Sequence, residues 1–398
     1  MNNGLHQVAE SNITAKPARL YYVDWLRVLA MVGIFLFHNA RFFDVITDWV
    51  VKNATTGIGP TIIVAFLDGW IMPLFFVLAG AGSYFALRFR NSMQFAKERT
   101  MRLLIPLFFG MFIIVVPQAY FEAVSHGELT GTSFFGYYPE YLTTLPELNW
   151  FHLWFLAYLF VFSLVALPIF RPFGKAAKSV VARAAAVLDK PWTLLPVLAL
   201  SIAVIDVLIS PTGFWGSRDT GGWNILSYAL FFLLGYLLFS DTRLLEIVKR
   251  FRWYFLGAGI ILSGLAFLFV DQIAEPEIYF GTASYNLAHL VRSMNSWTWM
   301  LAFIGIAARF LNFNNRFLTY AGEAVLPFYV LHQTVIISIG FFVVQWSMGI
   351  PLKYLIISTS SFAAIMAIYE VLVRRINVLR FLFGMRLKKK PKVTQQPN

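Results

Sequence analysis

The stretch DWLRVLAMVGIFLFHNARFF, residues 24–43, decides the class of fold. It is long and apolar enough for a membrane helix, yet it contains Asp24, Arg27, His38 and Arg41. Ionisable side chains are costly in hydrocarbon, and those that occur there usually serve a function. Two questions follow: what kind of protein surrounds this helix, and which chemistry needs these groups.

The composition of the whole chain answers the first question. Of the 398 residues, 59% are hydrophobic and only 13% are charged, whereas soluble domains average about 25% charged. Apolar stretches of spanning length lie near 22–43, 61–87, 103–121, 151–170, 192–209, 224–239, 254–270, 286–308, 320–346 and 352–373. The sequence therefore predicts an all-α, polytopic membrane protein with about ten transmembrane helices.

The positions of Lys and Arg predict the orientation of these helices. With a cytoplasmic N-terminus, the cations concentrate in the inner segments, whereas the outer loop 122–150 has four Glu and no Lys or Arg. This alternation predicts that both termini are inside. The expected parts are a cytoplasmic segment 1–20, a membrane domain 21–384 and a basic cytoplasmic tail 385–398. The net charge of +12 is spread over several loops and the tail, so we expect contact with the lipid bilayer and no nucleic-acid partner.

The ionisable groups of the first helix share one stripe, because successive residues turn by about 100°. Arg27 lies at the depth of the inner interface, where Asp24 is its expected partner. His38 lies roughly 16 Å further along the axis, in the outer half of the bilayer. An imidazole there is too short to reach water, so it either makes a structural hydrogen bond or belongs to a site. The shared stripe favours a polar interior path.

Three further histidines occur in the predicted helices. His152 and His289 open the fourth and eighth helices at their outer ends, and His332 lies within the ninth. A structural role can explain any one of them, but four at middle or outer depth favour a site. The chain has no Cys and no closely spaced His pair in a helix, which zinc and iron sites usually need. No metal is therefore predicted.

Several motifs together resemble the acyltransferase 3 family of bacterial integral-membrane O-acyltransferases. Arg27, ten intervening residues and His38 resemble the R-x10-H signature of this family. The other similar segments are MPLFFVLAGAGSYFALR (72–88), ERTMRLLIP (98–106), HLWFLAYLFVF (152–162), ILSYALFFLLGYLLF (225–239) and PFYVLHQTVII (327–337). The chain departs from the pattern at Ala79, where Ser is common. The small residues of AGAGSYF also predict a close approach of two helices.

The resemblance implies an activity and a location. It implies transfer of an acyl group, acetyl or succinyl, from cytoplasmic acyl-CoA to a hydroxyl of an extracytoplasmic glycan. It also implies a multi-pass protein of the bacterial cytoplasmic (inner) membrane. In this setting His38 is the expected catalytic base, which deprotonates the hydroxyl or relays the acyl group, and Arg27 completes the motif.

The remaining site residues follow from the same resemblance and from the chemistry of the two substrates. The phosphates of CoA need Arg at the inner face, so Arg27, Arg99 and Arg102 are the expected donor-binding residues. His152, His332 and Tyr329 are expected to hold the acceptor or to stabilise the oxyanion. Aromatic residues such as Trp150, Trp154 and Trp223 suit either sugar stacking or an interfacial belt.

A secondary transporter or flippase of a polar or lipid-linked solute is the alternative. Transporters also keep polar groups inside a helical bundle, and midplane carboxylates would favour this reading. The sequence offers no clear midplane acid, since Asp68 lies toward the outer side and Glu323 and Glu370 toward the inner side. We therefore prefer the acyltransferase hypothesis.

Overall fold

The computed structural model of the chain describes residues 19–46, 48–144, 150–170, 182–183, 185–218 and 220–388. All secondary structure in these residues is helical, which confirms the all-α prediction. Residues 1–18 of the predicted segment 1–20, residues 171–181 of a predicted inner loop and residues 389–398 of the basic tail lie outside the described residues.

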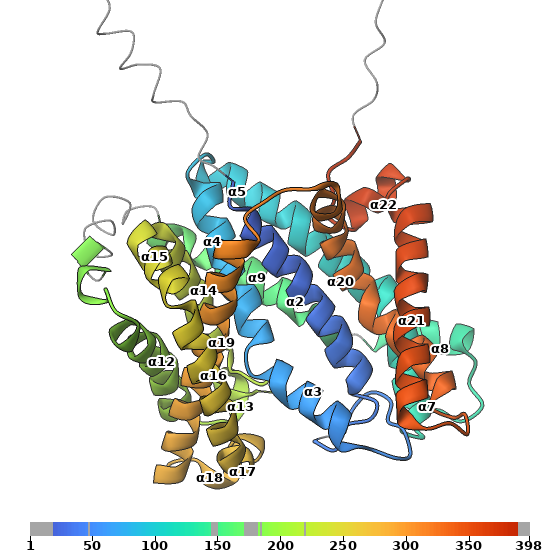
Figure 1. Cartoon of the computed structure of the whole chain (residues 1–398). Coiled ribbons are helices and arrows are strands. Elements are labelled where there is room, and N and C mark those ends of the chain that lie inside the picture. Colours follow the sequence, from blue (N-terminus) through green and yellow to red (C-terminus); the bar gives the residue numbers. More distant parts are fainter. Residues whose placement is uncertain are drawn as a thin grey trace, which may run out of the picture.

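The helices form one bundle (Figure 1). The first half contains α2 Tyr21–Ala40, α3 Ile58–Asp68, α4 Ile71–Leu87, α5 Ser92–Arg99, α6 Ile105–Phe109, α7 Val116–Ser125, α8 Phe134–Thr143, α9 Trp154–Val165 and α10 Leu167–Phe170. The second half contains α12 Pro191–Leu208, α13 Gly213–Gly216, α14 Ile225–Ser240, α15 Thr242–Arg250, α16 Arg252–Ala266, α17 Val270–Ala274, α18 Pro276–Tyr279, α19 Ala283–Phe310, α20 Arg316–Val343, α21 Ile350–Ile368 and α22 Asn377–Leu382. π-Helical turns at Thr100–Leu104 and Gly110–Ile114 join α5, α6 and α7.

Six helical segments among the described residues are long and apolar enough to cross a membrane, or up to eight if each bent pair is one span. The six are Tyr21–Ala40, Ile58–Leu87, Pro191–Leu208, Arg252–Ala274, Arg316–Val343 and Ile350–Val373, and the bent pairs are Ser92–Ile114 with Val116–Ser125 and Ile225–Ser240 with Thr242–Arg250. Each of the ten predicted ranges contains helix, but length and composition alone do not support ten spans.

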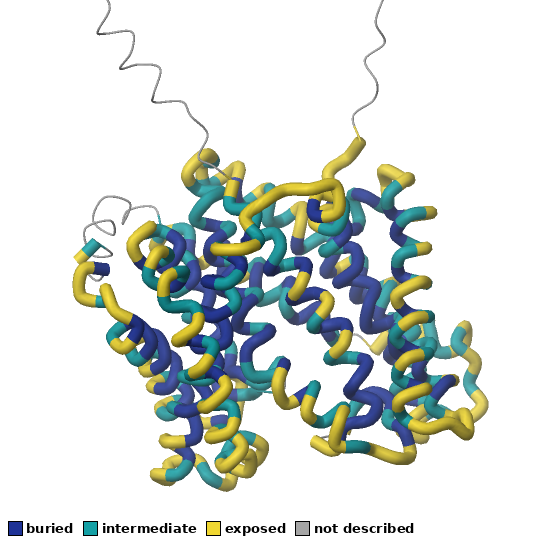
Figure 2. The backbone as a smooth tube through the Cα atoms, viewed as in Figure 1, coloured by how far each residue is buried: buried dark blue, intermediate teal, exposed yellow. Residues whose placement is uncertain are grey.

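The predicted ranges 151–170 and 286–308 are the two that fail this test, each for a different reason. Helix α9 has 12 residues, although a 3₁₀ turn at Phe151–Leu153 precedes it. Helix α19 has 28 residues but includes His289, Arg292 and Asn295, which lower its hydropathy. These polar residues are tolerated because α19 packs between α12 and α16, with most of its surface buried (Figures 1 and 2).

Helices α4 and α14 pack closely through glycine. A Cβ atom at Gly80 would collide with the carbonyl of Phe232, and one at Gly235 would collide with the backbone of Val77. This confirms the close helix approach that the small residues of AGAGSYF predict. The α4–α14 pair joins the α2, α20 and α21 side of the bundle to the α12, α16 and α19 side (Figure 1).

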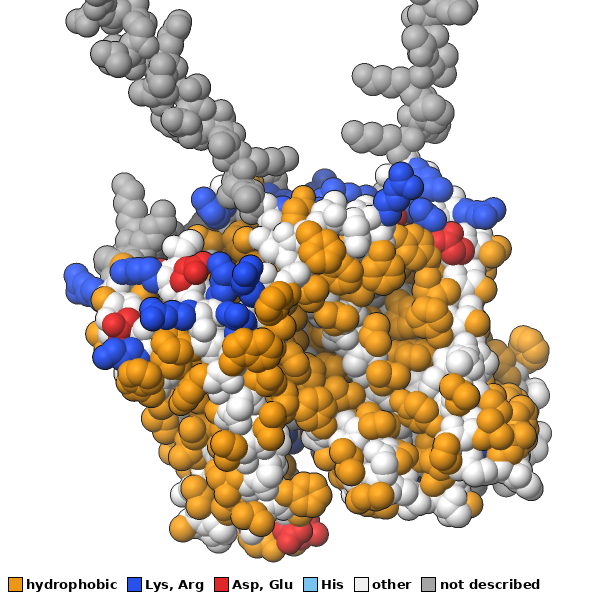
Figure 3. All heavy atoms as spheres, viewed as in Figure 1, with side chains coloured by type: hydrophobic (Ala, Val, Ile, Leu, Met, Phe, Trp, Pro, Cys, Tyr) orange, Lys and Arg blue, Asp and Glu red, His pale blue; other side chains and the backbone are white. Residues whose placement is uncertain are grey.

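Lys and Arg side chains gather on one end of the bundle, over α5, α15 and α22, whereas its flank is largely hydrophobic (Figure 3). We call this end the basic face. Helix α2 begins at the basic face and α22 lies on it, so the two ends of the described chain are on the same side (Figure 1). A hydrophobic flank below a cationic end suits a bilayer with anionic lipid heads.

Candidate active site

Three of the predicted histidines meet in the half of the bundle remote from the basic face. His38 comes from α2, His152 from the 3₁₀ turn before α9, and His332 from the middle of α20. The ring centroid of His332 lies 5.1 Å from that of His38 and 4.9 Å from that of His152. We call these three residues the histidine cluster. His152 and His332 are buried, whereas His38 is half-buried.

Backbone carbonyls hold two of the rings and leave one nitrogen of each ring open. His332 Nδ1 lies 2.6 Å from the carbonyl oxygen of Tyr329, and His152 Nε2 lies 3.2 Å from that of Val330. A carbonyl oxygen only accepts, so these two nitrogens carry protons when the rings are neutral. The opposite nitrogens, His332 Nε2 and His152 Nδ1, then present lone pairs. Among the described residues these two atoms and His38 Nδ1 are buried without a hydrogen-bond partner.

Tyr329 positions two members of the histidine cluster. Its hydroxyl donates a hydrogen bond to the backbone carbonyl of His152, and its ring lies 5.5 Å from the ring of His152. Tyr329 therefore fixes the turn that carries His152, while its own carbonyl fixes the ring of His332.

A folded loop, residues 41–46 and 48–57, covers the histidine cluster on the side away from the basic face. Trp49 stacks on His38 with ring centroids 5.9 Å apart and an interplanar angle of 15°. Phe42 lies against Trp49, and its ring also fills the space beside Gly340 in α20, where a Cβ would not fit. The loop is thus packed onto α20 and places an indole over the candidate base.

Buried ion pairs anchor this loop. Asp44 is fully buried and accepts hydrogen bonds from Arg41 at 2.9 Å and from Lys52 at 3.0 Å. Lys353, at the start of α21, donates to Asn53 at 2.7 Å. Burial lowers the pKa of Lys52, and its hydrogen bond to Asp44 opposes that shift. Arg41 was expected on the stripe of the first helix, but α2 ends at Ala40, and Arg41 serves the loop instead.

Arg27 lies at the opposite end of α2, near the basic face. Its guanidinium forms the expected ion pair with Asp24 at 3.4 Å and donates to the carbonyl of Leu78 at 3.0 Å. A Cβ at Gly82 would come within 2.8 Å of this guanidinium. The glycine in α4 therefore makes room for Arg27, which the sequence alone did not indicate.

Arg99 binds the same segment of α4. It donates to Ser83 at 3.2 Å, and its guanidinium lies 4.7 Å from the centroid of the Phe95 ring. The charges of Arg27 and Arg99 are close enough to act on each other. Two cations on one stretch of helix form a local excess of positive charge, which is suited to an anion.

Arg102 is more exposed and opens into a pocket of about 410 Å³ on the basic face. Its ion pair with Glu98 spans 3.5 Å, and Lys97 and Arg386 line the same pocket. The segment after α22 forms one wall, because Gly384 packs against the backbone of Arg102. The pocket thus combines three cations with apolar side chains beside the arginine pair Arg27 and Arg99.

His289 does not join the histidine cluster. It lies 3.6 Å from Asp206 of α12, a fully buried carboxylate that also accepts from Asn224 at 2.5 Å and from Ser227 at 3.2 Å. Arg218 pairs with Asp206 at 3.6 Å. We call these five residues the Asp206 network. Asp206 was not among the predicted site residues, although an acid within the apolar run SIAVIDVLIS indicates a functional or paired group.

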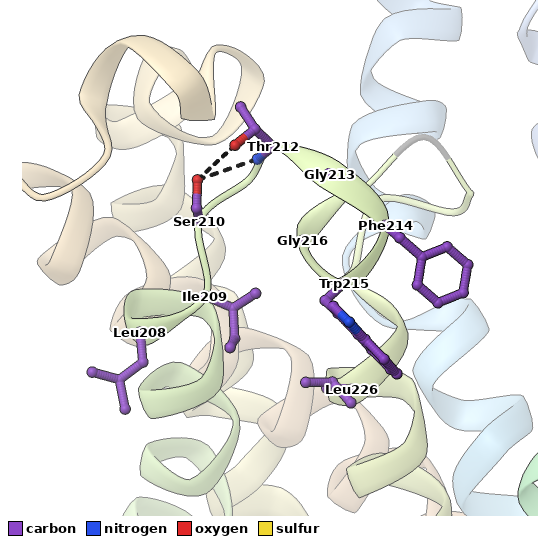
Figure 4. Close-up of a pocket in the computed structure, with 9 residues that line it drawn as sticks. All are labelled: Leu208, Ile209, Ser210, Thr212, Gly213, Phe214, Trp215, Gly216 and Leu226. Carbon is purple, nitrogen blue, oxygen red and sulfur yellow. Dashed lines mark hydrogen bonds between the residues drawn. The ribbon is translucent and has the colours of Figure 1, made fainter.

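Two of the three aromatic residues assigned to the outer mouth are in the interior. Trp154 and Trp223 are 7% and 0% exposed, so neither forms an interfacial belt, whereas Trp150 is half-buried. An apolar pocket of about 570 Å³ does carry exposed aromatics, Phe214 and Trp215, and lies between the end of α12 and α14 (Figure 4). It contains none of the predicted site residues.

The described part of the chain contains no group of three or more His, Cys, Asp or Glu residues that could hold a metal ion. The histidine cluster can accept hydrogen bonds from a substrate, since it presents buried lone pairs beside a half-buried imidazole. The fold is that of a multi-pass membrane protein, and the histidine cluster is its candidate site.

The chain belongs to the acyltransferase 3 family, whose acyltransferase domain matches residues 20–370. Curated relatives include Glucans biosynthesis protein C of Salmonella heidelberg, Salmonella paratyphi B and Salmonella enteritidis. Each is 26% identical in an alignment of 395 residues that covers 96% of this chain and 98% of the relative. These matches confirm the resemblance carried by HLWFL (152–156), YVLHQTVIISIGFFV (329–343) and YEVLVRRINVLRFLFG (369–384). No solved structure matches the chain. The protein is therefore a multi-pass membrane acyltransferase.

Proposed function

We propose that the protein transfers an acyl group, acetyl or succinyl, from cytoplasmic acyl-CoA to a hydroxyl of an extracytoplasmic glycan. The observation that carries the proposal is the layout of α2, which has cations at one end and the histidine cluster near the other. The name of the relatives, Glucans biosynthesis protein C, supports a glucan as the acceptor. The setting is the bacterial inner membrane.

The donor enters from the basic face in this proposal. Arg27, Arg99 and Arg102 bind the phosphates of CoA, since guanidinium groups form strong, charge-assisted hydrogen bonds with phosphate. The 410 Å³ pocket beside Arg102 takes the nucleotide end. The thioester arm then runs along α2 toward His38, a distance of roughly 16 Å for the eleven helical steps from Arg27 to His38.

The reaction is a single displacement at the thioester carbonyl. His38 takes the proton from the acceptor hydroxyl, and the oxygen attacks the carbonyl carbon. The carbon–sulfur bond breaks, and the CoA sulfur leaves with the proton that His38 returns. His152 and His332 position the acceptor with their open nitrogens, and Tyr329 keeps His152 in place.

Reconstitution tests the activity. The purified protein in vesicles is expected to transfer labelled acetyl or succinyl groups from the CoA thioester to glucose oligosaccharides on the other side of the membrane. Transport of the intact oligosaccharide without acylation would favour the transporter alternative and overturn the proposal. A protein that only hydrolyses the thioester would retain the donor assignment and reject the acceptor.

The orientation is part of the proposal: both termini inside, ten spans and the basic face in the cytoplasm. The chain has no Cys, so a thiol reagent reacts only with the Cys residue that is introduced. Thr130→Cys and Glu277→Cys are expected to react with an impermeant thiol reagent in intact cells, and Met93→Cys only after permeabilisation. The opposite pattern would reverse the orientation.

A further inference from the structure

Asp68 and Arg292 face each other across a gap beside Gly222. The Cβ that Gly222 lacks would lie 3.0 Å from Asp68 Oδ2 and 3.0 Å from Arg292 Nη2. The two charged atoms are therefore no more than about 6 Å apart, the sum of these distances. Yet no ion pair or hydrogen bond joins Asp68 and Arg292 in the part of the chain that the structure describes.

Arg292 is held in position with spare hydrogen-bonding capacity. One nitrogen, Nη2, donates to the carbonyl of Gly222 at 2.6 Å, and the guanidinium lies 4.1 Å from the centroid of the Trp223 ring. The side chain is 6% exposed, and its Nη1 is buried without a partner among the described residues. Buried guanidinium atoms are costly to leave unpaired, so Arg292 has hydrogen-bonding capacity left for a ligand.

The gap lies at the level of the histidine cluster. Counting about 1.5 Å per residue from the ends of α2, α20 and α19 at the basic face, His38, His332 and Arg292 lie at roughly 24–27 Å. The charge of Arg41, three residues after His38, also acts on Asp68.

The segment that carries Gly222 also contacts the region of the histidine cluster, through the neighbouring residue Gly221. Gly221 packs against the ring of Trp154, which follows His152 by two residues, and the hydroxyl of Tyr228 donates to the Gly221 carbonyl. Gly222 itself has φ +79°, a conformation that favours glycine, and any side chain there would enter the gap.

We propose that Asp68 and Arg292 bind a hydroxyl of the acceptor sugar in the space that Gly222 leaves open. One hydroxyl donates to the Asp68 carboxylate and accepts from Arg292, and two hydrogen bonds of about 2.8–2.9 Å can join these groups when the charged atoms are less than about 5.8 Å apart. The arrangement selects a neutral ligand with several hydroxyl groups, because the two charges compensate each other. This subsite rests on the proposed function and specifies how the glycan is held beside His38.

Direct sugar binding tests the subsite without any acyl transfer. The full-length protein in nanodiscs is titrated calorimetrically with the glucose disaccharides sophorose, laminaribiose and cellobiose, with no acyl donor present. Asp68→Asn and Gly222→Ala are expected to weaken the affinity of the best-bound sugar by about 10- to 100-fold, the effect of losing a hydrogen bond to a charged group. Thermal unfolding confirms that each variant is folded.

Gly281→Ala is the matched control. Gly281 has φ +81°, and its Cβ would meet nothing within 4 Å, so alanine there has the same backbone strain without entering a gap. Its sugar affinity is expected to equal that of the unmodified protein.

The binding titration and the transfer assay together decide whether the proposal holds. Weaker binding in both gap variants and normal binding in Gly281→Ala support it. Equal affinity in all proteins, or no sugar binding by the unmodified protein, overturns it and leaves the gap to a water molecule. The acyl-transfer assay is separate: transfer with an unchanged acceptor KM in Asp68→Asn rejects only the subsite, whereas sugar binding without transfer rejects only the proposed activity.

Discussion

The histidine cluster and the Asp206 network are both buried in the half of the bundle remote from the basic face, but they satisfy their polar atoms differently. In the cluster, His152 and His332 each use one nitrogen on a backbone carbonyl and keep the other open. In the network, Asp206 Oδ1 accepts hydrogen bonds from Asn224 and Ser227 and pairs with Arg218, while Asp206 Oδ2 and both nitrogens of His289 are buried without a hydrogen-bond partner among the described residues.

The difference separates two reasons for keeping polar groups in a membrane. A carboxylate that ties α12 to α14 and α19 replaces the hydrophobic driving force that is missing between helices in lipid. Imidazoles that are oriented but not saturated contribute little to packing and remain available to a substrate. We therefore expect substitutions in the cluster to affect chemistry and substitutions in the network to affect stability.

The largest effect is expected for His38→Gln. Glutamine can replace a structural hydrogen bond but cannot take a proton at neutral pH, so acyl transfer should fall by at least ~10²-fold. The amount of folded protein in the membrane should stay near normal. Rates are measured per folded molecule in reconstituted vesicles. A glutamine variant that acylates normally would move the base to His332 or His152.

Asp206→Ala should produce the opposite result. Removing the carboxylate leaves Arg218 buried without its partner, and breaking a buried pair in this way costs roughly 3–5 kcal/mol. The free energy of unfolding should therefore fall strongly, while the folded fraction keeps its turnover. Asp271→Ala, an exposed acid of α17, is the control and should change neither quantity. Unchanged thermal unfolding in Asp206→Ala would contradict the structural role.

Arg102→Ala should affect the donor alone. Loss of one charge-assisted hydrogen bond to a phosphate should raise the KM for acyl-CoA by about tenfold and leave the acceptor KM unchanged. Arg243→Ala removes another cation of the basic face, one that pairs with Asp241, and serves as the control. If both variants raise the KM equally, the effect is a general one of surface charge.

The smallest effect is expected for Trp49→Ala. The indole covers His38, so its removal should let water compete with the acceptor and raise thioester hydrolysis in the absence of sugar by a few-fold. Release of free CoA thiol measures this rate. Trp346→Ala, at an exposed indole, should leave hydrolysis unchanged.

Much of the helical framework was predictable because membrane helices are long apolar runs. The start of α20 was predicted at 320 but lies at Arg316, since Asn315 caps the helix with its side chain, a signal that the hydropathy pattern does not contain. The ion-paired loop 41–57 was not predictable, because its anchor Lys353 is 300 residues from its partner Asn53.

The site was predictable as a set of residues but not as an arrangement. His38, His152 and His332 could be singled out, since histidines in apolar helices are costly. Their convergence could not be read from spacing, because three helices far apart in the chain contribute them. The same limit applies to His289, which has the same sequence signal but joins the Asp206 network.

Helix α19 has a consequence for how the protein is made. Its Arg292 alone would cost about 2.5–3.5 kcal/mol at the centre of a helix entering the bilayer, and His289 and Asn295 add to that cost. Such a segment does not partition stably into lipid by itself. It becomes stable only when α12 and α16 enclose it and Gly222 and Asp206 meet its polar groups. Biogenesis therefore has an order: α12 and α16, which are translated first, must still be within reach when α19 leaves the insertion machinery.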